Sequence, residues 1–590
     1  MFLKKTPQKT GRVHLAIAKG YRSGGKNKTK TIESLGYLDE FEGIYEDPIA
    51  HFKAVAEEMT LREQEQYASQ QITIHPMERI DKRKDGQRKN VGCAVLMSHY
   101  NSLGIERALR NAARTRSFSY DANAIMRVLV TERAFRPGSK RSAVQNACNY
   151  FFRSKFSEDD VYRCLDFFAE CKEPVIAAMN RSIETAGKRD MTSVFYDVTN
   201  YYFECDKQDD DVLDEKTGEV IQVGLRKVGV NKNKSKSNKP IVQMGLLQDE
   251  NAIPITFKTF SGNTNDCTTL LPVLKELKGS YGLKDVVVVA DKGCNTSDNI
   301  AACILDGNDF VFSQSIKGTK STDELRRWAI ADTGYEENAD GTFKKKSRQD
   351  IKKLTIKDDD GKVIVAIDVE VKVVAFWSRK YDQRAKKKRA EVIARAERLV
   401  KNPSEYNKKT HLGAAKYVKN ITFDKKTGEI LEDVGKRAII NEQAILDAEA
   451  CDGFYCIITS KTNWSTDKII DTYKGLWRIE EAFKISKSDI ASRPVYVWTK
   501  KHIEAHFLTC FITLTLIRLI QYDNGFAYSA GVIIDELKAM SGTNEDGNWW
   551  LFDHRSDISD ALCASVGIDL SRKRMKLAEI KDVLAKVNGR

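Results

Sequence analysis

The chain has 590 residues, a mass of 66.8 kDa and a formal net charge of +13 at pH 7. This length is too great for one domain and predicts three or four, while the basic excess favours a polyanionic partner. The twelve cysteines include no CxxC pair, which argues against zinc ligands or a disulfide framework and indicates reduced thiols in a cytosolic protein.

Residues 1–85 are expected to form a small β-containing unit. Val13, Leu15 and Ile17 alternate with polar residues, and the basic turn SGGKNKTK leads to a second extended run at 31–38. Residues 86–190 have a helical pattern that the polar turn RPGSKRS interrupts once, at 136–142. Their local excess of arginine and lysine predicts a helical DNA-binding region.

Residues 191–314 have the pattern of a mixed α/β sheet of ribonuclease H type. The β-branched and aromatic run at 192–204 and the segments 240–247 and 253–260 predict three antiparallel strands. A helix at 266–278, a buried strand at 286–290, a helix near 296–306 and a strand at 309–313 are expected next. A last strand at 454–459 leads into the second part of this core, 456–525.

Residues 315–455 interrupt this alternation and are expected to form an inserted subdomain that contains strands. Extended pieces near 363–376 and 436–440 accompany a very basic helical stretch at 379–401. Residues 526–590 predict a helical C-terminal tail. The most apolar stretch, 507–520, contains Arg518 and only 14 residues, so it predicts a buried helix instead of a membrane span. The N-terminal MFLKKTPQKT has no apolar segment of a signal peptide.

Glu480 is a carboxylate at a position where the sequence predicts an apolar side chain. It belongs to a series with alternating spacings of four and three, which predicts the inward stripe of one amphipathic helix. Burying an unpaired carboxylate is costly, so a cation should meet Glu480 there. Glu481 is the rival acid, but it leaves the stripe. The series is Ile469, Tyr473, Leu476, Glu480, Phe483, Lys487 and Ile490.

Two aspartates have equally apolar surroundings. Asp197 lies in the middle of the strand-like VFYDVTNYY, and Asp291 follows VVVVA, at the edge where α/β sheets bind ligands. Either aspartate alone is more often a turn or capping acid. Three buried carboxylates, however, would repel one another unless cations neutralised them, and Mg²⁺ prefers oxygen ligands. The hypothesis is a phosphodiester-cleaving site with two Mg²⁺ ions, for which Mn²⁺ could substitute.

Three segments resemble the catalytic blocks of DDE insertion-sequence transposases with the Y-R-E-K signature. They are TSVFYDVTN, VVVVADKGCN and YKGLWRIEEAFKISK. Tyr473, Glu480 and Lys487 occupy matching positions, whereas Leu476 stands at the arginine position. The resemblance covers roughly 190–520 and implies a ribonuclease H-like core whose catalytic, metal-binding acids are Asp197, Asp291 and Glu480. It also implies a transposase that cuts element ends and joins them to target DNA.

Several side chains are expected to contact DNA. The resemblance makes Tyr473 and Lys487 phosphate contacts. Trp477 either stacks on a displaced base or packs in the core, and Lys484 either contacts DNA or pairs with Glu480 along the helix. The basic loop 226–239 and the helix 379–401 are either phosphate contacts or solvated surfaces. The full expected set is Tyr473, Trp477, Arg478, Lys484, Lys487, Arg226, Lys227, Lys232, Lys234 and Lys236.

The resemblance also implies partners and a location. Family members work on paired element ends, which implies that double-stranded DNA is the partner and that the protein is a homodimer in the DNA complex. Residues 1–85 are then expected to contact DNA. The resemblance also implies a cytoplasmic bacterial protein that is on the nucleoid when it is bound to DNA. Two other functions stay open: a metal-dependent DNA nuclease without strand transfer, and a non-catalytic DNA-binding protein derived from a transposase. His502 and His506 have a spacing that can bind zinc, but Ile503 stands where an HEXXH motif needs glutamate.

Overall fold

The computed structural model describes two compact units, 1–83 and 84–590. In the first unit, β1 (Phe2–Pro7), β2 (Val13–Ser23) and β3 (Lys26–Tyr37) form an antiparallel sheet, followed by η1 (Leu38–Glu40) and α1 (Pro48–Tyr67). Leu15 and Ile17 are buried, which confirms the predicted β unit. The described residues are 1–8, 11–23, 26–67, 77, 88–152, 155–229, 239–281, 285–317, 322–357, 363–401, 413–419, 422–423, 430–431, 439–546 and 548–588.

The second unit begins with a short strand that was not expected, followed by the helical region that the sequence predicts. Asp121 and Ser139 accept hydrogen bonds from the first turns of α4 and α5 and so fix where these helices begin. The predicted break at 136–142 separates the two helices. The elements are β4 (Arg88–Asn90), α2 (Cys93–Ser102), α3 (Ile105–Ala112), α4 (Ala122–Phe135), α5 (Lys140–Asn146), η2 (Ala147–Asn149), α6 (Glu158–Glu170) and α7 (Lys172–Thr185).

Five strands form a ribonuclease H-like sheet, which confirms the expected fold class. Their order is β9-β8-β5-β10-β11; β5, β8 and β9 form an antiparallel meander, and β10 runs parallel to both β5 and β11. The strands are β5 (Ser193–Tyr202), β8 (Ile241–Gln248), β9 (Pro254–Ser261), β10 (Val287–Ala290) and β11 (Asp309–Gln314). Between them lie β6 (Val212–Leu213), β7 (Val220–Gln222), η4 (Asp266–Thr268), α8 (Leu270–Tyr281), η5 (Lys292–Cys294) and α9 (Ser297–Leu305).

Both faces of this sheet are covered. Phe195 and Val289 pack into a core shared with the helical region, whereas Val194 and Val288 pack into a second core with α8 and α9. Successive side chains of a strand point to opposite faces, so β-branched and aromatic residues fill both sides. The VVVVA run is therefore buried throughout, as the sequence predicts.

The segment 315–455, expected to be an inserted subdomain that contains strands, forms two small strand pairs (418–419 with 439–440, and 422–423 with 430–431) and one long hairpin. The long hairpin β13 (Phe343–Lys357) and β14 (Val363–Ser378) joins the core sheet through β19 (Phe454–Thr459), which pairs with β11. The sheet thus has nine strands. The remaining elements of the segment 315–455 are α10 (Asp323–Ile330), β12 (Glu336–Glu337), α11 (Arg379–Lys401), η7 (Ala415–Tyr417), β15 (Val418–Lys419), β16 (Thr422–Phe423), β17 (Ile430–Leu431), β18 (Ile439–Ile440) and α13 (Glu442–Glu449).

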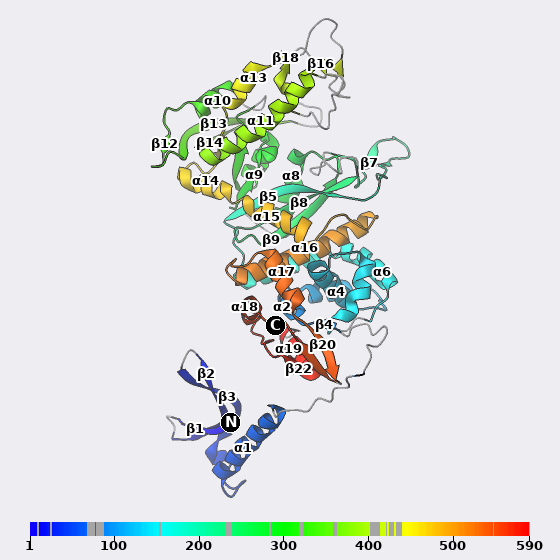
Figure 1. The fold of residues 1–590 in the computed structure, drawn as a ribbon, viewed down its shortest axis with the longest axis vertical. Coiled ribbons are helices and arrows are strands. Elements are labelled where there is room, and N and C mark those ends of the chain that lie inside the picture. Colours follow the sequence, from blue (N-terminus) through cyan, green and yellow to red (C-terminus); the bar gives the residue numbers. More distant parts are fainter. Residues whose placement is uncertain are drawn as a thin grey trace. The chain divides into compact units, whose positions relative to one another are not determined.

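Helix α16 (Lys500–Asp523) lies between the sheet and the helical region and contacts β9, α4 and α6 (Figure 1). The predicted buried helix is confirmed, although its 24 residues exceed the apolar stretch from which it was predicted. By length and composition this helix could cross a membrane, but 94% of its apolar window is buried inside the protein. Its Arg518 is fully buried.

The C-terminal tail is not purely helical as predicted. Three short strands pair with one another and with β4, far away in the sequence, to form a four-stranded sheet. Such short strands depend on distant partners and leave little periodicity in the sequence. The elements are α17 (Ala530–Ala539), β20 (Ser541–Asp546), β21 (Trp549–Phe552), α18 (Asp557–Ser565), β22 (Arg574–Lys576) and α19 (Leu577–Asn588).

Candidate active site

The register of two parallel strands brings Asp197 beside Asp291. In the β5–β10 pair, Tyr196 lies opposite Ala290. Continuing this register by one position sets Asp197 next to Asp291, on strands that lie about 4.8 Å apart. Both carboxylates point to the same face of the sheet as Phe195 and Val289, two residues before them, which is the face covered by the helical core.

The prediction of one continuous amphipathic helix around Glu480 is wrong, because the helix is broken there. α14 (Thr466–Lys474) and α15 (Trp477–Lys484) are separated by a tight turn, and the π-helix η8 (Ile485–Asp489) follows. Backbone bonds from residue i to i−3 at Leu476, Arg478 and Ile479 form this turn. A turn of three residues rotates the following side chains relative to an ideal α-helix. The buried face of α15 is therefore Ile479, Ala482 and Phe483, and Glu480 is exposed.

Gly475 allows this turn to pack closely on the sheet. A Cβ atom at this position would lie 2.7 Å from the ring of Phe195, which is completely buried. Any larger residue would force α14 and α15 away from β5. The glycine thus holds the Glu480 helix against the strand that carries Asp197.

The three acids line one cleft of about 550 Å³. Asp197 is half-buried, while Asp291 and Glu480 are exposed, so the expectation of three buried carboxylates is wrong. Three cations balance the acids in the same lining. The lining residues are Asp197, Asp291, Lys292, Phe376, Tyr381, Arg384, Tyr455, Tyr473, Lys474, Leu476, Trp477, Ile479 and Glu480.

Hydrogen bonds orient two of the acids. Asp291 Oδ1 accepts bonds from Ser313 Oγ at 2.9 Å and from the Tyr473 hydroxyl at 3.4 Å. Asp197 Oδ1 accepts the backbone N–H of Val198 at 2.7 Å. Burial, together with the charge of Asp291, raises the pKa of Tyr473, so its hydroxyl remains a donor at neutral pH.

The donor set of the cleft suits a hard cation. Carboxylate oxygens from neighbouring strands are ligands that Mg²⁺ prefers. Burial, with smaller contributions from the charges of Asp197, Asp266 and Asp291, raises the pKa of the nearby Cys294 thiol. Among the described residues, however, no three acidic, histidine or cysteine side chains stand close enough to hold a metal ion. Metal binding by Asp197, Asp291 and Glu480 would therefore need the three carboxylates to move closer together.

Glu481, the rival third acid, has a structural partner. Its carboxylate forms an ion pair with Arg518 at 2.8 Å, and Arg518 also donates to the backbone carbonyl of Arg478 at 2.9 Å. Arg518 is fully buried, so this pair ties α15 to α16. The carboxylate of Glu480, in contrast, forms no hydrogen bond or ion pair with any residue that the structure describes.

The expected DNA contacts near Glu480 differ in their exposure and in their hydrogen-bond or ion-pair partners. Trp477 lines the cleft with 56% of its surface exposed, so the alternative of core packing is wrong for this residue. Lys484 is exposed and makes no ion pair with Glu480 within the described residues. Lys487 is half-buried and donates to Thr199 Oγ1 on β5. Arg478 pairs with Glu250 at 2.6 Å and is not part of the cleft lining.

The basic loop after β7 is described only in part. Arg226 pairs with Asp209 at 2.5 Å, and Lys227 pairs with Asp211 at 2.8 Å. Both side chains are largely covered, so either would have to leave its acid to contact a phosphate. Lys232, Lys234 and Lys236 lie outside the described residues.

His502 and His506 have different partners. His502 lies 3.6 Å from Asp166, whereas the buried His506 bonds the carbonyl of Ser492 at 3.0 Å. Burial lowers the pKa of His506 well below its ordinary value, which keeps the ring neutral. The two rings thus have structural contacts rather than a shared metal among the residues described.

Sequence reasoning overlooked the three cations of the cleft lining, Lys292, Arg384 and Lys474. Lys292 follows Asp291 directly, so its position beside an expected catalytic acid was a usable signal. Arg384 is one of many cations on α11, and no periodicity distinguishes it from the others. It reaches the cleft because the helix packs against β14.

Comparisons with known proteins identify two parts of this chain. A family model described as "IS1634 family transposase, N-terminal domain" matches residues 3–71, and one described as "Transposase DDE domain" matches residues 221–516. The second match includes Asp291 and Glu480, while Asp197 precedes it. A search of curated proteins found no match. A solved structure, the piggyBac transposase synaptic complex with hairpin DNA, is similar with a TM-score of 0.30 and 9% identity over 84% of each chain.

The DDE-domain match spans just over half of the 590 residues. It begins within β7 and ends within α16, so it takes in most of the nine-stranded sheet and the helices around Glu480. The match to the N-terminal domain covers the separate small unit. The chain therefore belongs to the DDE-domain transposases.

Proposed function

We propose that this transposase cuts the ends of an insertion sequence and joins the freed 3′-hydroxyls to target DNA, with Asp197, Asp291 and Glu480 as its catalytic acids. One observation carries this assignment. Three carboxylates that are up to 283 positions apart in sequence line one cleft at the edge of a ribonuclease H-like sheet. That edge is where open α/β sheets bind ligands.

Two Mg²⁺ ions, or Mn²⁺ in their place, are proposed to bind these acids. Such ions, when bound, supply activation of the attacking hydroxyl and stabilisation of the leaving oxygen. The chain's own contribution is to hold the ligands and the strand. Ser313 and Tyr473 occupy Oδ1 of Asp291, which leaves Oδ2 as a ligand atom. Lys292, which lines the same cleft beside Asp291, is proposed to bind the phosphate under attack.

Double-stranded DNA is the proposed substrate, bound as element ends and as target. Trp477 supports this because an indole that is more than half exposed beside the acids offers a stacking surface for a base. Tyr473, Arg478, Lys484, Lys487, Arg226, Lys227, Lys232, Lys234 and Lys236 remain proposed DNA contacts. A homodimer on paired ends is also proposed, as is recognition of the terminal repeats by the first unit and the helical region.

A strand-transfer assay tests this function. The full-length protein is incubated with Mg²⁺, target plasmid and a pre-cleaved duplex from the DNA that flanks the coding region, carrying a free 3′-hydroxyl. Joined product is expected with wild-type protein and should fall by at least about 100-fold in Glu480→Gln, as loss of a transition-state electrostatic contact does. Asp298→Asn, an exposed acid outside the cleft lining, should join normally.

A second substrate, an uncut element end, separates the alternatives. Cleavage of an uncut element end without any joined product would identify a nuclease. Binding with neither cleavage nor joining would identify a non-catalytic DNA-binding protein.

A further inference from the structure

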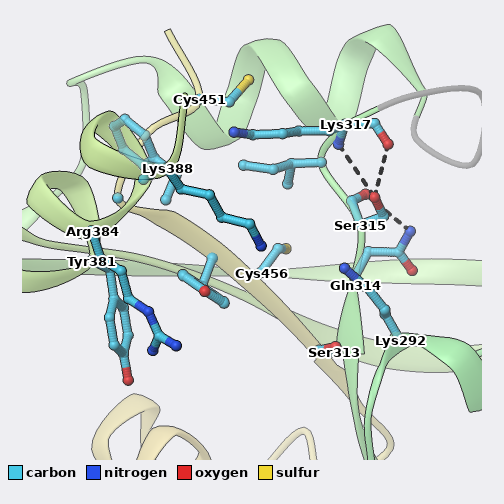
Figure 2. Close-up of a pocket in the computed structure, with 15 residues that line it drawn as sticks. Lys292, Ser313, Gln314, Ser315, Lys317, Tyr381, Arg384, Lys388, Cys451 and Cys456 are labelled. Carbon is cyan, nitrogen blue, oxygen red and sulfur yellow. Dashed lines mark hydrogen bonds between the residues drawn. The ribbon is translucent and has the colours of Figure 1, made fainter. Parts of the chain in front are cut away.

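A second cavity, of about 470 Å³, adjoins the cleft that holds the acids. Its walls come from three places: the end of β11 and the residues after it, one side of α11, and the chain leading into β19. Figure 2 shows Lys388 reaching from α11 into the middle of this cavity, with Arg384 one turn earlier on the same helix. Lys292 and Lys317 line it from the sheet edge.

The cavity concentrates positive charge without a matching acid in its lining. Lys292, Lys317, Arg384 and Lys388 line it together with serine, glutamine, cysteine and apolar side chains. In the described part of the chain, Lys292, Arg384 and Lys388 form no ion pair. Lys317 lies 3.5 Å from Asp452, outside the lining. Cations gathered in one space repel one another, so an anion bound among them would be favoured.

The position of Lys317 is fixed by its local backbone. Ser315 Oγ donates to the carbonyl of Lys317 at 2.8 Å and accepts from its N–H at 3.3 Å, which closes a tight turn after β11. Burial lowers the pKa of Lys317. An anion in the cavity would offset that penalty, because it would replace the solvation that the ammonium has lost.

The cavity and the acid cleft share a wall. Lys292, Tyr381, Arg384 and Tyr455 line both, and the rings of Tyr381 and Tyr455 lie 4.9 Å apart between them. A DNA strand cut at the acids would therefore pass directly along this wall. The cationic cavity lies where the neighbouring phosphates of that strand would follow.

We infer that the cavity lined by Lys317, Arg384 and Lys388, with Lys292 on the wall that it shares with the acid cleft, binds backbone phosphates of the DNA strand next to the phosphate that is cut. This inference rests on the proposed function for the identity of the strand. Arg384 suits bidentate contact with a phosphate, and the lysines act as point charges. Such contacts position the strand without reading its sequence. The insertion helix α11 would thereby set which phosphodiester lies at the acids.

The test compares two adjacent lysines of α11. Lys388 lines the cavity, whereas Lys387 is exposed and does not. Affinity for a duplex from the flanking DNA is measured against salt concentration, using full-length protein in the non-cleaving Glu480→Gln background. Each lost phosphate contact lowers the slope of log K against log salt by about 0.7 to 0.9. Lys388→Ala should lose about this much, Lys388→Arg should lose little, and Lys387→Ala should lose nothing.

A neutral methylphosphonate, placed in turn at each phosphate around the cleavage position, locates the contact. At one or two phosphates beside the cut, it should lower the wild-type slope and leave the slope of Lys388→Ala unchanged. Equal slopes for wild type, Lys388→Ala and Lys387→Ala would overturn the inference. So would Lys388-dependent binding of inorganic phosphate without any effect on DNA, because the cavity would then take a free anion. These binding results do not depend on whether strand transfer occurs.

Discussion

Replacing each of the neighbouring acids Glu480 and Glu481 separately by alanine should give opposite effects on stability and on DNA cleavage. Glu481→Ala should destabilise the packing of α15 on α16, because the fully buried Arg518 would lose its only carboxylate partner among the described residues. Removing one member of a buried pair costs about 3–5 kcal/mol. Glu481 is 34% exposed, so water can partly replace it, and two other acceptors of Arg518 remain. We therefore expect a cost of about 2–3 kcal/mol.

The cost can be read from native-state amide exchange. Local opening of α15 and α16 should speed exchange by about 30- to 150-fold in Glu481→Ala, since 1.4 kcal/mol corresponds to a factor of ten. Glu480→Ala should leave exchange unchanged because its side chain is exposed and unpaired within the described structure, yet DNA cleavage should be lost. The reasoning is refuted if Glu481→Ala exchanges like wild type while losing cleavage, because Glu481 would then be the third catalytic acid.

Three further predictions follow from single contacts. Gly475→Ala should lower the free energy of unfolding by about 1–3 kcal/mol, measured by denaturant unfolding, because its methyl group would overlap the ring of Phe195. DNA cleavage should also fall, because the helix that carries Glu480 would shift. Trp477→Ala should leave the thermal midpoint unchanged but weaken DNA binding by about 5- to 100-fold, the value of one stacked base, in a fluorescence titration. Lys140 is buried, which lowers its pKa from the ordinary 10.5 to about 7. The cost of burying its charge is complete below pH 7 and disappears as pH rises to about 10.5, so the thermal midpoint should rise over this window, and Lys140→Met should remove that rise.

The candidate acids could be predicted from sequence because each stands where its element disfavours a charge. Asp197 interrupts a β-branched strand and Asp291 ends a buried one, and strand pairing then brings them side by side. Glu480 does not lie on the inward face of one continuous helix, as its spacing predicts, although its position in the cleft fits the proposed role. A spacing of three and four residues persists through a tight turn and a π-helix, so the pattern could not reveal that Glu480 faces solvent.

Features that depend on distant pairing were not predictable. The hairpin β13–β14 has the strand pattern expected of an inserted subdomain, but only its register with β19 makes it part of the core sheet. Likewise, α11 was predicted with correct bounds, yet nothing in its run of cations separates Lys388 from Lys387. The face that a basic helix turns toward a cavity is decided by its packing, which periodicity of charge alone does not encode.

Iron-directed cleavage of the polypeptide tests most directly whether Asp197, Asp291 and Glu480 bind metal together. Fe²⁺ bound in place of Mg²⁺ generates hydroxyl radicals, in the presence of ascorbate and peroxide, that cut the backbone beside the ion. We expect fragments that end near all three positions, suppressed by excess Mg²⁺ and absent from Asp291→Asn. Cuts elsewhere in the chain, or cuts that persist in Asp291→Asn, would contradict a metal-binding catalytic site in this cleft.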